Sequence, residues 1–409
     1  MSSSTSSSRP VFLRIFLACV LGMGASMGLV RLFTFAMDAN AETILGRVLE
    51  AMDALPQIVA EEDELVMVYG SSMVDAGFSA RQFDRQLAQR GVEVKSFNFG
   101  FGGLNPFFQD YLARRIRGAF EAEDRRLGLT IIELNPFQIT EARWRGAQPV
   151  IDSYLAVLAS PREVWEMTRE DPARGIRILN IHFLRDDISA EVITWFFGRG
   201  LRPPRPRSDL PRDEAKEERL QEVKELLDGR FEEDYPDFPE GTRWWYPWQG
   251  AGTLPEERSE ETVALITESH ALRRQARRMD NDKLNRIACC DIEGLHFEDE
   301  LVEAFIRTVQ SFQEISDQVE IVLLPRNTDW IHYSEDARGR LDAMIQRVSD
   351  GTGLPVRDFQ DLDVITPEMF RDTTHLSRYE GDIAFTEFLV DTYEETLRAE
   401  PRGQGSAAQ

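Results

Sequence analysis

Apolar runs that alternate with helical patterns constrain the fold of this chain more than any other feature of its sequence. Patterns typical of helices lie between the runs, for example Ala80–Arg90 and the stretch from Phe107 to about Glu123. Strands that alternate with helices form parallel sheets with right-handed crossovers. The sequence therefore predicts an α/β fold in which three layers, α/β/α, are built around a five-stranded parallel sheet. The expected strands are Leu65–Tyr69, Val92–Asn98, Leu129–Leu134, Val319–Leu324 and Leu354–Phe359.

Two of the expected helices carry start signals. Ser79 followed by Gln82 has the pattern of a capping box, so we expect a helix to begin at Ala80. Asn105 and Pro106 are typical of the N-cap and the first position of a second helix.

Three short blocks follow the first three expected strands directly. Because the carboxyl ends of parallel strands meet at one edge of a sheet, where open α/β sheets bind ligands, we expect these blocks to converge. Each block alone is typical of an ordinary turn, and it is their joint occurrence in order that indicates a site. They are Tyr69-Gly70-Ser71-Ser72, Asn98-Phe99-Gly100-Phe101-Gly102-Gly103 and Glu133-Leu134-Asn135-Pro136, and a fourth, Asp372-Thr373-Thr374-His375-Leu376-Ser377, supplies an acid and an imidazole.

In this order, the blocks resemble those of the SGNH (GDSL-like) superfamily of hydrolases and acyltransferases. The resemblance covers roughly Leu65 to Pro136 and Val319 to Thr396, and it implies the flavodoxin-like fold of that superfamily. Two neighbours of the reacting positions differ from the family pattern. The usual Gly-Asp-Ser is Gly-Ser-Ser at 70–72, and the usual Gly-x-Asn-Asp is Glu-Leu-Asn-Pro at 133–136.

The resemblance also implies roles for five residues. Ser72 would be the nucleophile, and His375 and Asp372 would complete a catalytic triad with it. The oxyanion hole would be formed by the backbone N–H groups of Ser72 and Gly103 and by the side-chain amide of Asn135.

The chemistry of these residue types agrees with the roles. A serine hydroxyl is a weak nucleophile at neutral pH and needs a base within hydrogen-bond reach. Asp372 stands three residues before His375, so its carboxylate can hold one ring nitrogen and leave the other facing Ser72. Gly103 has no Cβ and lets a backbone N–H approach a substrate oxygen, while Asn135 offers an uncharged donor.

The N-terminal region predicts a membrane anchor. Residues Val11–Met37 are almost wholly apolar apart from Arg14 and Arg31, and a helix of this length crosses a bilayer core of about 30 Å. Arg9 and Arg14 place the amino end in the cytoplasm and the large domain on the extracytoplasmic, periplasmic side of the inner membrane. Ala39-Asn40-Ala41 fits a cleavage site, so a cleaved signal peptide is the alternative to a single-pass anchor.

Composition argues against some partners and cofactors. The 71 Asp and Glu residues outnumber the 47 Lys and Arg residues, and the net charge of −24 repels nucleic-acid phosphates. Cys289 and Cys290 are adjacent, and we expect them to remain thiols, with a strained vicinal disulfide as the alternative. No spacing typical of a metal site accompanies them, so we predict no metal and no cofactor.

These patterns divide the chain into five parts. We expect a cytoplasmic N-terminus and anchor at 1–41, a catalytic domain in two pieces at 42–141 and 317–398, a largely helical insertion or cap at 142–316, and a disordered tail at 399–409.

The expected insertion holds helical stretches and the densest aromatic cluster of the chain. The helices are expected at Ser160–Arg169 and Glu214–Leu227, and the cluster is Trp244-Trp245-Tyr246-Pro247-Trp248. Flat aromatic faces suit a sugar ring or an interfacial contact, and the alternative is that they fill a small satellite core.

Two classes of function follow. The first is a membrane-tethered esterase or O-acyltransferase that acts through an acyl-enzyme on an acylated glycan or similar ester. For that class the resemblance implies an integral membrane acyltransferase as partner. The second is a non-catalytic binding or scaffold protein of a cell-envelope or exopolysaccharide modification system.

Overall fold

The computed structural model describes residues 9–35, 44–103, 105–141, 151–152, 154–156, 158–184, 214–234, 259–276 and 294–398. The chain divides into two compact units. The first comprises Met1–Leu45 and Gln148–Pro204, and the second comprises Gly46–Ala147 and Arg205–Gln409.

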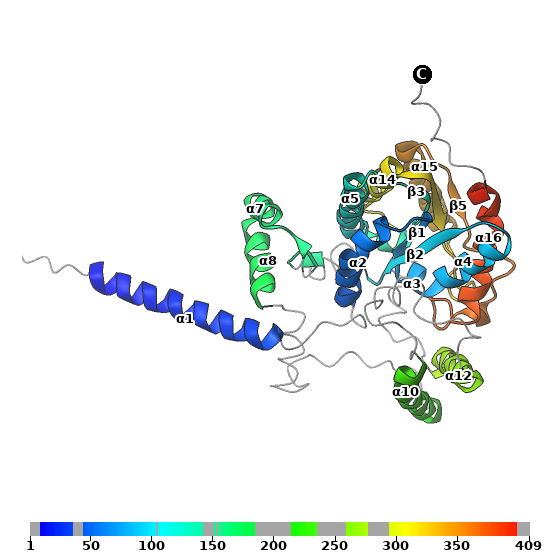
Figure 1. The fold of residues 1–409 in the computed structure, drawn as a ribbon, viewed down its shortest axis with the longest axis horizontal. Helices are drawn as coiled ribbons and strands as arrows, with labels where there is room; N and C mark the ends of the chain where they lie inside the picture. Colours follow the sequence, from blue (N-terminus) through cyan, green and yellow to red (C-terminus); the bar gives the residue numbers. More distant parts are fainter. Residues whose placement is uncertain are drawn as a thin grey trace, which may run out of the picture. The chain divides into compact units, whose positions relative to one another are not determined.

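The second unit is built on a parallel sheet of five strands in the order β2-β1-β3-β4-β5 (Figure 1). The predicted five-stranded parallel sheet is therefore confirmed. In the register of β1 and β2, Ser71 lies opposite Phe101, and in that of β3 and β4, Glu133 lies opposite Val322. The strands are β1 (Glu64–Ser71), β2 (Val94–Phe101), β3 (Leu127–Glu133), β4 (Ser316–Leu323) and β5 (Val356–Asp358).

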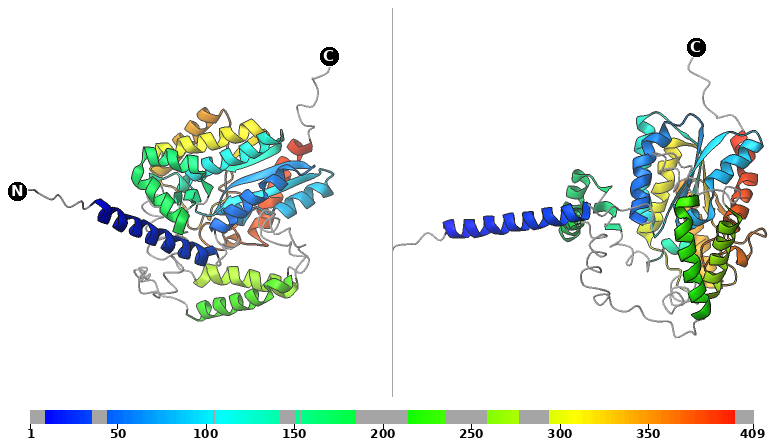
Figure 2. Two further views of the ribbon diagram at one scale, coloured as in Figure 1. Left: turned by 60° about the vertical axis from the view of Figure 1, so that its left-hand side comes forward. Right: turned by 60° about the horizontal axis from the view of Figure 1, so that its bottom comes forward.

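Helices pack on both faces of this sheet, consistent with a three-layer arrangement (Figures 1 and 2). One face is covered by α3 (Ser72–Gly77), α4 (Ala80–Gln89) and α16 (Gly381–Arg398). The helices α5 (Pro106–Ala122) and α14 (Asp299–Ile315) pack against each other on the opposite face, and α15 (Glu335–Thr352) packs on α14.

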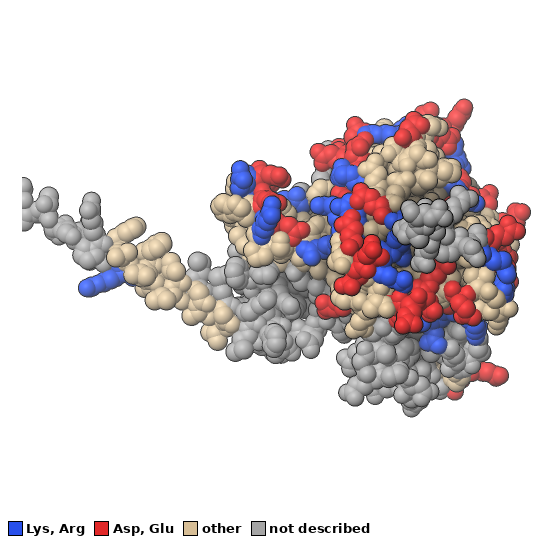
Figure 3. Space-filling model, turned by 45° about the horizontal axis from the view of Figure 1, so that its top comes forward, with Lys and Arg blue, Asp and Glu red and all other residues tan. Residues whose placement is uncertain are grey.

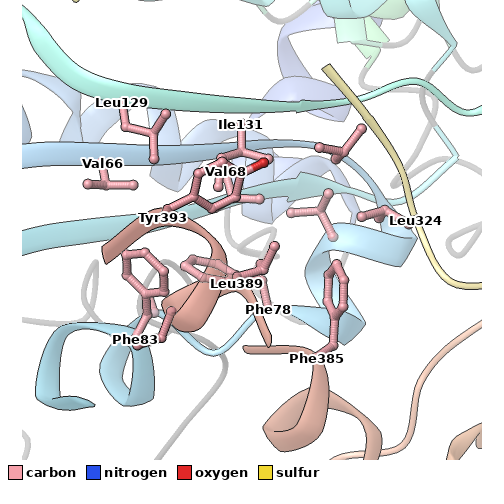
Figure 4. Close-up of a cluster of buried hydrophobic side chains, with 14 of the residues drawn as sticks. Val66, Val68, Phe78, Phe83, Leu129, Ile131, Leu324, Phe385, Leu389 and Tyr393 are labelled. Atoms are coloured by element: carbon pink, nitrogen blue, oxygen red, sulfur yellow. The ribbon is translucent and has the colours of Figure 1, made fainter. Parts of the chain in front are cut away.

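Alternate residues of β1 supply the two halves of the core. Val66 and Val68 point toward α4 and α16, where they meet a cluster of buried rings and aliphatic side chains (Figure 4). Tyr69 points the other way, because its ring centroid lies 4.9 Å from that of Phe312 in α14, and its hydroxyl donates to the Gln109 carbonyl oxygen of α5 at 2.7 Å. Burial on both faces explains why this strand is an almost unbroken apolar run.

Both predicted helix starts are confirmed, since α4 begins at Ala80 and α5 at Pro106, but the two caps differ in outcome. Asn105 caps α5 as expected, since its side-chain oxygen accepts from the Phe108 N–H at 3.2 Å. The predicted capping box at Ser79 is wrong, because the Ser79 side chain makes no capping bond. The Ser79 N–H instead donates to Thr386 Oγ1 at 3.0 Å, and Gln82 Nε2 donates to the Ile383 carbonyl oxygen at 3.1 Å. Both residues thus bind α16.

The expected insertion at 142–316 includes one helix of the core. The helix α14 packs on α5 and on β3 and β4, so the layered part of the chain resumes before residue 317. Other helices described within 142–316 include α7 (Pro161–Glu170), α8 (Pro172–Leu184), α10 (Glu214–Asp234) and α12 (Glu260–Ala276). Ser160 caps α7 with a full capping box. The tryptophan cluster at 244–248 and the pair Cys289 and Cys290 lie outside the described residues.

At the N-terminal end, two helices are described. They are α1 (Arg9–Phe35) and α2 (Ile44–Val59). Within the part of the chain that the structure describes, no helix combines the length and apolar character needed to cross a membrane. The proposed cleavage site, Ala39-Asn40-Ala41, lies outside the described residues.

Oppositely charged side chains lie among one another on the face drawn in Figure 3. Several ion pairs join separate elements, for example Arg126 with Asp317 at 2.6 Å and Arg117 with Glu314 at 3.0 Å. Exposed pairs of this kind contribute little to stability, about 0 to 1 kcal/mol each.

Candidate active site

Five chain segments meet at the carboxyl edge of the sheet. Ser72 follows β1 directly, Gly103 lies two residues beyond β2, and Asn135 lies two residues beyond β3. Arg326 comes from the loop after β4. The loop that holds Asp372 and His375 leads into α16, whose packing on α3 and α4 brings it to the same edge.

The structure brings the three predicted triad residues together. His375 Nε2 lies 2.8 Å from Ser72 Oγ, and His375 Nδ1 lies 3.0 Å from both carboxylate oxygens of Asp372. This geometry favours the tautomer in which Nδ1 donates to Asp372 and Nε2 accepts from the Ser72 hydroxyl. The side chains of His375 and Asp372 are 23% and 20% exposed, so the group remains open to a ligand.

A tight turn fixes the Asp372 carboxylate. The backbone N–H groups of Thr374 and His375 both donate to Asp372 Oδ1 at 2.9 Å, a turn that aspartate favours. Burial alone would raise the pKa of Asp372. The hydrogen bonds from His375 and from these backbone groups outweigh it, and the pKa lies well below its usual range. Asp372 is therefore ionised and able to stabilise a protonated His375.

The start of α3 positions Ser72, the predicted nucleophile. Ser71 is the N-cap, and its Oγ accepts from the Met73 N–H at 3.2 Å. Ser72 is then the first residue of the helix, where a backbone N–H has no acceptor within the helix. The N–H of Ser72 is thus positioned to donate to a ligand beside its own hydroxyl.

Asn98 and Gly100 hold α3 in place from the neighbouring strand. Asn98 Nδ2 donates to the carbonyl oxygens of Val74 at 3.0 Å and Phe78 at 2.7 Å, and the Gly100 N–H donates back to Asn98 Oδ1. A Cβ on Gly100 would lie 2.1 Å from the Asp75 nitrogen, so only glycine allows this approach. This part of the second block therefore supports the turn that carries Ser72.

Gly103 lies at the same edge but makes no hydrogen bond to the other site residues in the described part of the chain. Its φ of +71° is a left-handed conformation that favours glycine. An added Cβ would meet nothing within 4 Å, so backbone conformation rather than crowding requires glycine here.

Asn135 is held at both ends of its amide. Its Nδ2 donates to Ser71 Oγ at 3.1 Å and to Glu133 Oε1 at 2.9 Å. Its Oδ1 accepts from the Phe137 N–H at 3.1 Å and from Arg326 Nη2 at 3.2 Å. The structure thus places the predicted oxyanion donor beside the residue that precedes the nucleophile, with its amino group already donating.

Glu133 and Arg326 are site residues to which the sequence alone gave no role. Each stands where an apolar strand ends, and a charged residue at such a buried position is the signal that could have indicated them. Within the described ranges, no group of three or more His, Cys, Asp or Glu side chains is arranged to hold a metal ion.

No family model matches this chain. No curated protein matches it either.

Proposed function

We propose that the chain is a serine esterase or O-acyltransferase of SGNH type that works through an acyl-enzyme on Ser72. The observation that carries the proposal is the contact of 2.8 Å between Ser72 Oγ and His375 Nε2, with Asp372 bound to the other ring nitrogen. A hydroxyl, an imidazole and a carboxylate in this order are the parts of an activated nucleophile.

The proposed reaction has two halves that share one intermediate. His375 takes the proton of Ser72 as Oγ attacks the ester carbonyl, and the tetrahedral oxyanion is stabilised by the N–H groups of Ser72 and Gly103 and by the Asn135 amide. The C–O bond to the leaving alcohol then breaks, and His375 gives that oxygen its proton. Water or a sugar hydroxyl attacks the acyl-enzyme in the second half, which makes the protein a hydrolase or a transferase.

The strand order β2-β1-β3-β4-β5 supports assignment to the flavodoxin-like SGNH fold. In that order β2 lies on one side of β1 while β3, β4 and β5 follow on the other, and the loops gather at the carboxyl edge beside the point where the order reverses. We extend the proposal to a single-pass anchor in the inner membrane and a periplasmic catalytic domain. Exposed apolar side chains along α1, such as Phe12 at 74% and Leu21 at 69%, support membrane association. The proposed substrate is an acylated envelope glycan or similar ester, with an integral membrane acyltransferase as partner.

A non-catalytic SGNH-fold scaffold of a cell-envelope or exopolysaccharide modification system is the second candidate. The observation that favours it is the engaged Asn135 amide, since a donor already bound to Ser71 and Glu133 is less available to a substrate.

A covalent probe separates the two candidates. The full chain in detergent is treated with a fluorophosphonate, and release of nitrophenol from nitrophenyl acetate is followed in parallel. Wild type should be labelled, Ser72→Ala should lose labelling and turnover, and Ser349→Ala, near the C-terminal end of α15, should keep both. Labelling that persists in Ser72→Ala would contradict the choice of nucleophile, and an unlabelled wild type would favour the scaffold.

A further inference from the structure

Behind the nucleophile lies a buried charged pair joined through one amide. Glu133, at the end of β3, is 1% exposed, and Arg326, after β4, is 4% exposed. Asn135 lies between them, with its amino group on Glu133 and its carbonyl on Arg326. Buried charges are costly unless they are hydrogen-bonded, so an arrangement of this kind requires a reason.

The Glu133 carboxylate is committed to the turn that carries the nucleophile. Its Oε2 accepts from the Ser71 N–H at 2.6 Å, and its Oε1 contacts Ser71 Oγ at 3.0 Å and accepts from Asn135 Nδ2 at 2.9 Å. Burial raises the pKa of Glu133, against these hydrogen bonds and the nearby Arg326 charge, which lower it. Because each of these contacts runs to Ser71 or Asn135, those two residues connect Glu133 to the reacting atoms.

Arg326 holds the other end of the amide. Its guanidinium lies 4.2 Å from the centroid of the Phe137 ring, and its Nη1 lies 2.6 Å from Met73 Sδ. Its backbone N–H donates to the Gln360 carbonyl oxygen at 2.9 Å. These contacts fix the cation in front of Asn135 Oδ1.

The polarity of the pair selects one orientation of the amide. The two ends of an asparagine side chain have nearly the same shape, so only their hydrogen-bond partners distinguish them. A flipped Asn135 would turn its carbonyl toward the Glu133 carboxylate and its amino group toward the Arg326 guanidinium. Both contacts would be repulsive. With the observed orientation, the amino group faces the residue that precedes Ser72.

We infer that Glu133 and Arg326 are positioning residues that clamp the Asn135 amide, and with it the turn that carries Ser72, in the orientation that stabilises the oxyanion. This clamp rests on the proposed function, because it assigns Asn135 to the oxyanion. The engaged amino group is then the pre-organised state of a donor. As the oxyanion forms, the Asn135 N–H that faces Ser71 Oγ is shared with the substrate oxygen, while the other N–H stays on Glu133.

The test is a double-mutant cycle on the full chain in detergent. Glu133→Gln keeps the size of the side chain but turns an N–H toward either Ser71 or Asn135. We expect kcat per phosphonate-titrated site to fall by about 10- to 100-fold with KM changed less than about threefold. In an Asn135→Ala background the same change should cost clearly less than in wild type, because only the part of its effect that passes through Ser71 remains. Arg326→Met should also lower kcat per titrated site in wild type, and it should cost less in the Asn135→Ala background.

A matched control separates positioning from folding. Glu320 in β4 is also an acid paired with an arginine, Arg357 at 2.6 Å, and Glu320→Gln should leave kcat per titrated site unchanged. A double variant in which the separate fold decreases in kcat from Glu133→Gln and Asn135→Ala simply multiply would overturn the clamp. So would a loss of thermal stability in Glu133→Gln with no change of kcat per titrated site.

A second readout distinguishes failure of the clamp from failure of the proposed function. In protein labelled with ¹⁵N at asparagine, the side-chain amide resonances of Asn135 are assigned by their loss in Asn135→Ala. Glu133→Gln and Arg326→Met should each shift these resonances, and Glu320→Gln should not. If wild type is inactive but the shifts occur, the amide clamp stands and the esterase proposal fails. Unshifted resonances would overturn the clamp whatever the activity.

Discussion

His375 Nε2 lies 2.8 Å from Ser72 Oγ although 303 positions separate the two residues in the chain. The contact depends on α16, which follows the histidine loop and packs on α3 and α4. Hydrogen bonds to Ser79 and Gln82 reinforce that packing. His375 is therefore brought to Ser72 by the docking of one helix.

Asp372→Asn should lower kcat by about 10³- to 10⁴-fold, because an asparagine amino group at this position would donate to His375 Nδ1. The proton would then reside on Nε2, which could no longer accept from Ser72. Steady-state kinetics with nitrophenyl acetate check the prediction, and labelling by a fluorophosphonate should slow in parallel. A decrease of less than about tenfold would argue against Asp372 as the orienting group.

Gly103→Ala should strain the backbone without crowding it. Alanine in a left-handed conformation costs about 1 to 2 kcal/mol, and a shifted N–H should reduce kcat as well. Gly353 is the matched control, since it has the same φ of +71° and equally open space but caps α15. Gly353→Ala should show a similar loss in the free energy of unfolding, measured in urea, with kcat unchanged. Equal kcat in both variants would remove Gly103 from the oxyanion hole.

Asn98→Ala should destabilise the protein by about 2 to 3 kcal/mol, because it leaves buried carbonyl groups of α3 without their donor. The start of α3 would also loosen, so kcat should fall together with the free energy of unfolding. Denaturation in urea and kinetics on the same sample check both effects. A variant with full activity and reduced stability would show that α3 keeps its position without Asn98.

Asp84 should make stability depend on pH. Burial raises the pKa of Asp84 from 3.8 to about 7, although hydrogen bonds from Ser96 lower it. The folded protein therefore holds a proton that the unfolded chain has released, and the free energy of unfolding should fall as pH rises between these values, by at most about 1.4 kcal/mol per pH unit. Asp84→Asn keeps an acceptor for the Ser96 N–H and should gain stability relative to wild type over the same window. If the free energy of unfolding changed with pH in the same way in wild type and in Asp84→Asn, the raised pKa of Asp84 would be contradicted.

The proposed topology predicts that alkaline phosphatase fused after Gln409 is active in cells, since it works only outside the cytoplasm. The fusion should stay with membranes after a high-salt wash. An inactive reporter would place the domain in the cytoplasm, and an active reporter in the soluble fraction would favour cleavage after Ala41.

The sheet could be predicted because its strands are nearly continuous apolar runs. The contact between Ser72 and His375 could also be predicted, because the four blocks follow one another in order along the chain. Spacing alone would not have sufficed, since Glu293 precedes His296 and Asp329 precedes His332 by the same three positions. Among these three histidines, His375 alone follows the last expected strand, Leu354–Phe359.

Other features could not be predicted because they depend on partners distant in the chain. Ser79 and Gln82 have a capping pattern, but α16 supplies stronger tertiary partners for them. Asn135 and Arg326 are 191 positions apart, and no local pattern joins them. The helix α14 lies in a stretch whose surroundings are highly charged, so its membership in the core became evident only from its packing on α5.

On the proposed function, the docking of α16 would also determine when in the life of the protein Ser72 becomes reactive. Ser72 is synthesised long before His375, and until α16 reaches α4 its hydroxyl is an ordinary alcohol with no base beside it. A chain that is still being made would thus be inert toward the esters around it. Any event that detaches α16 from the mature fold would remove His375 from Ser72 again, although Ser72 itself would be unchanged.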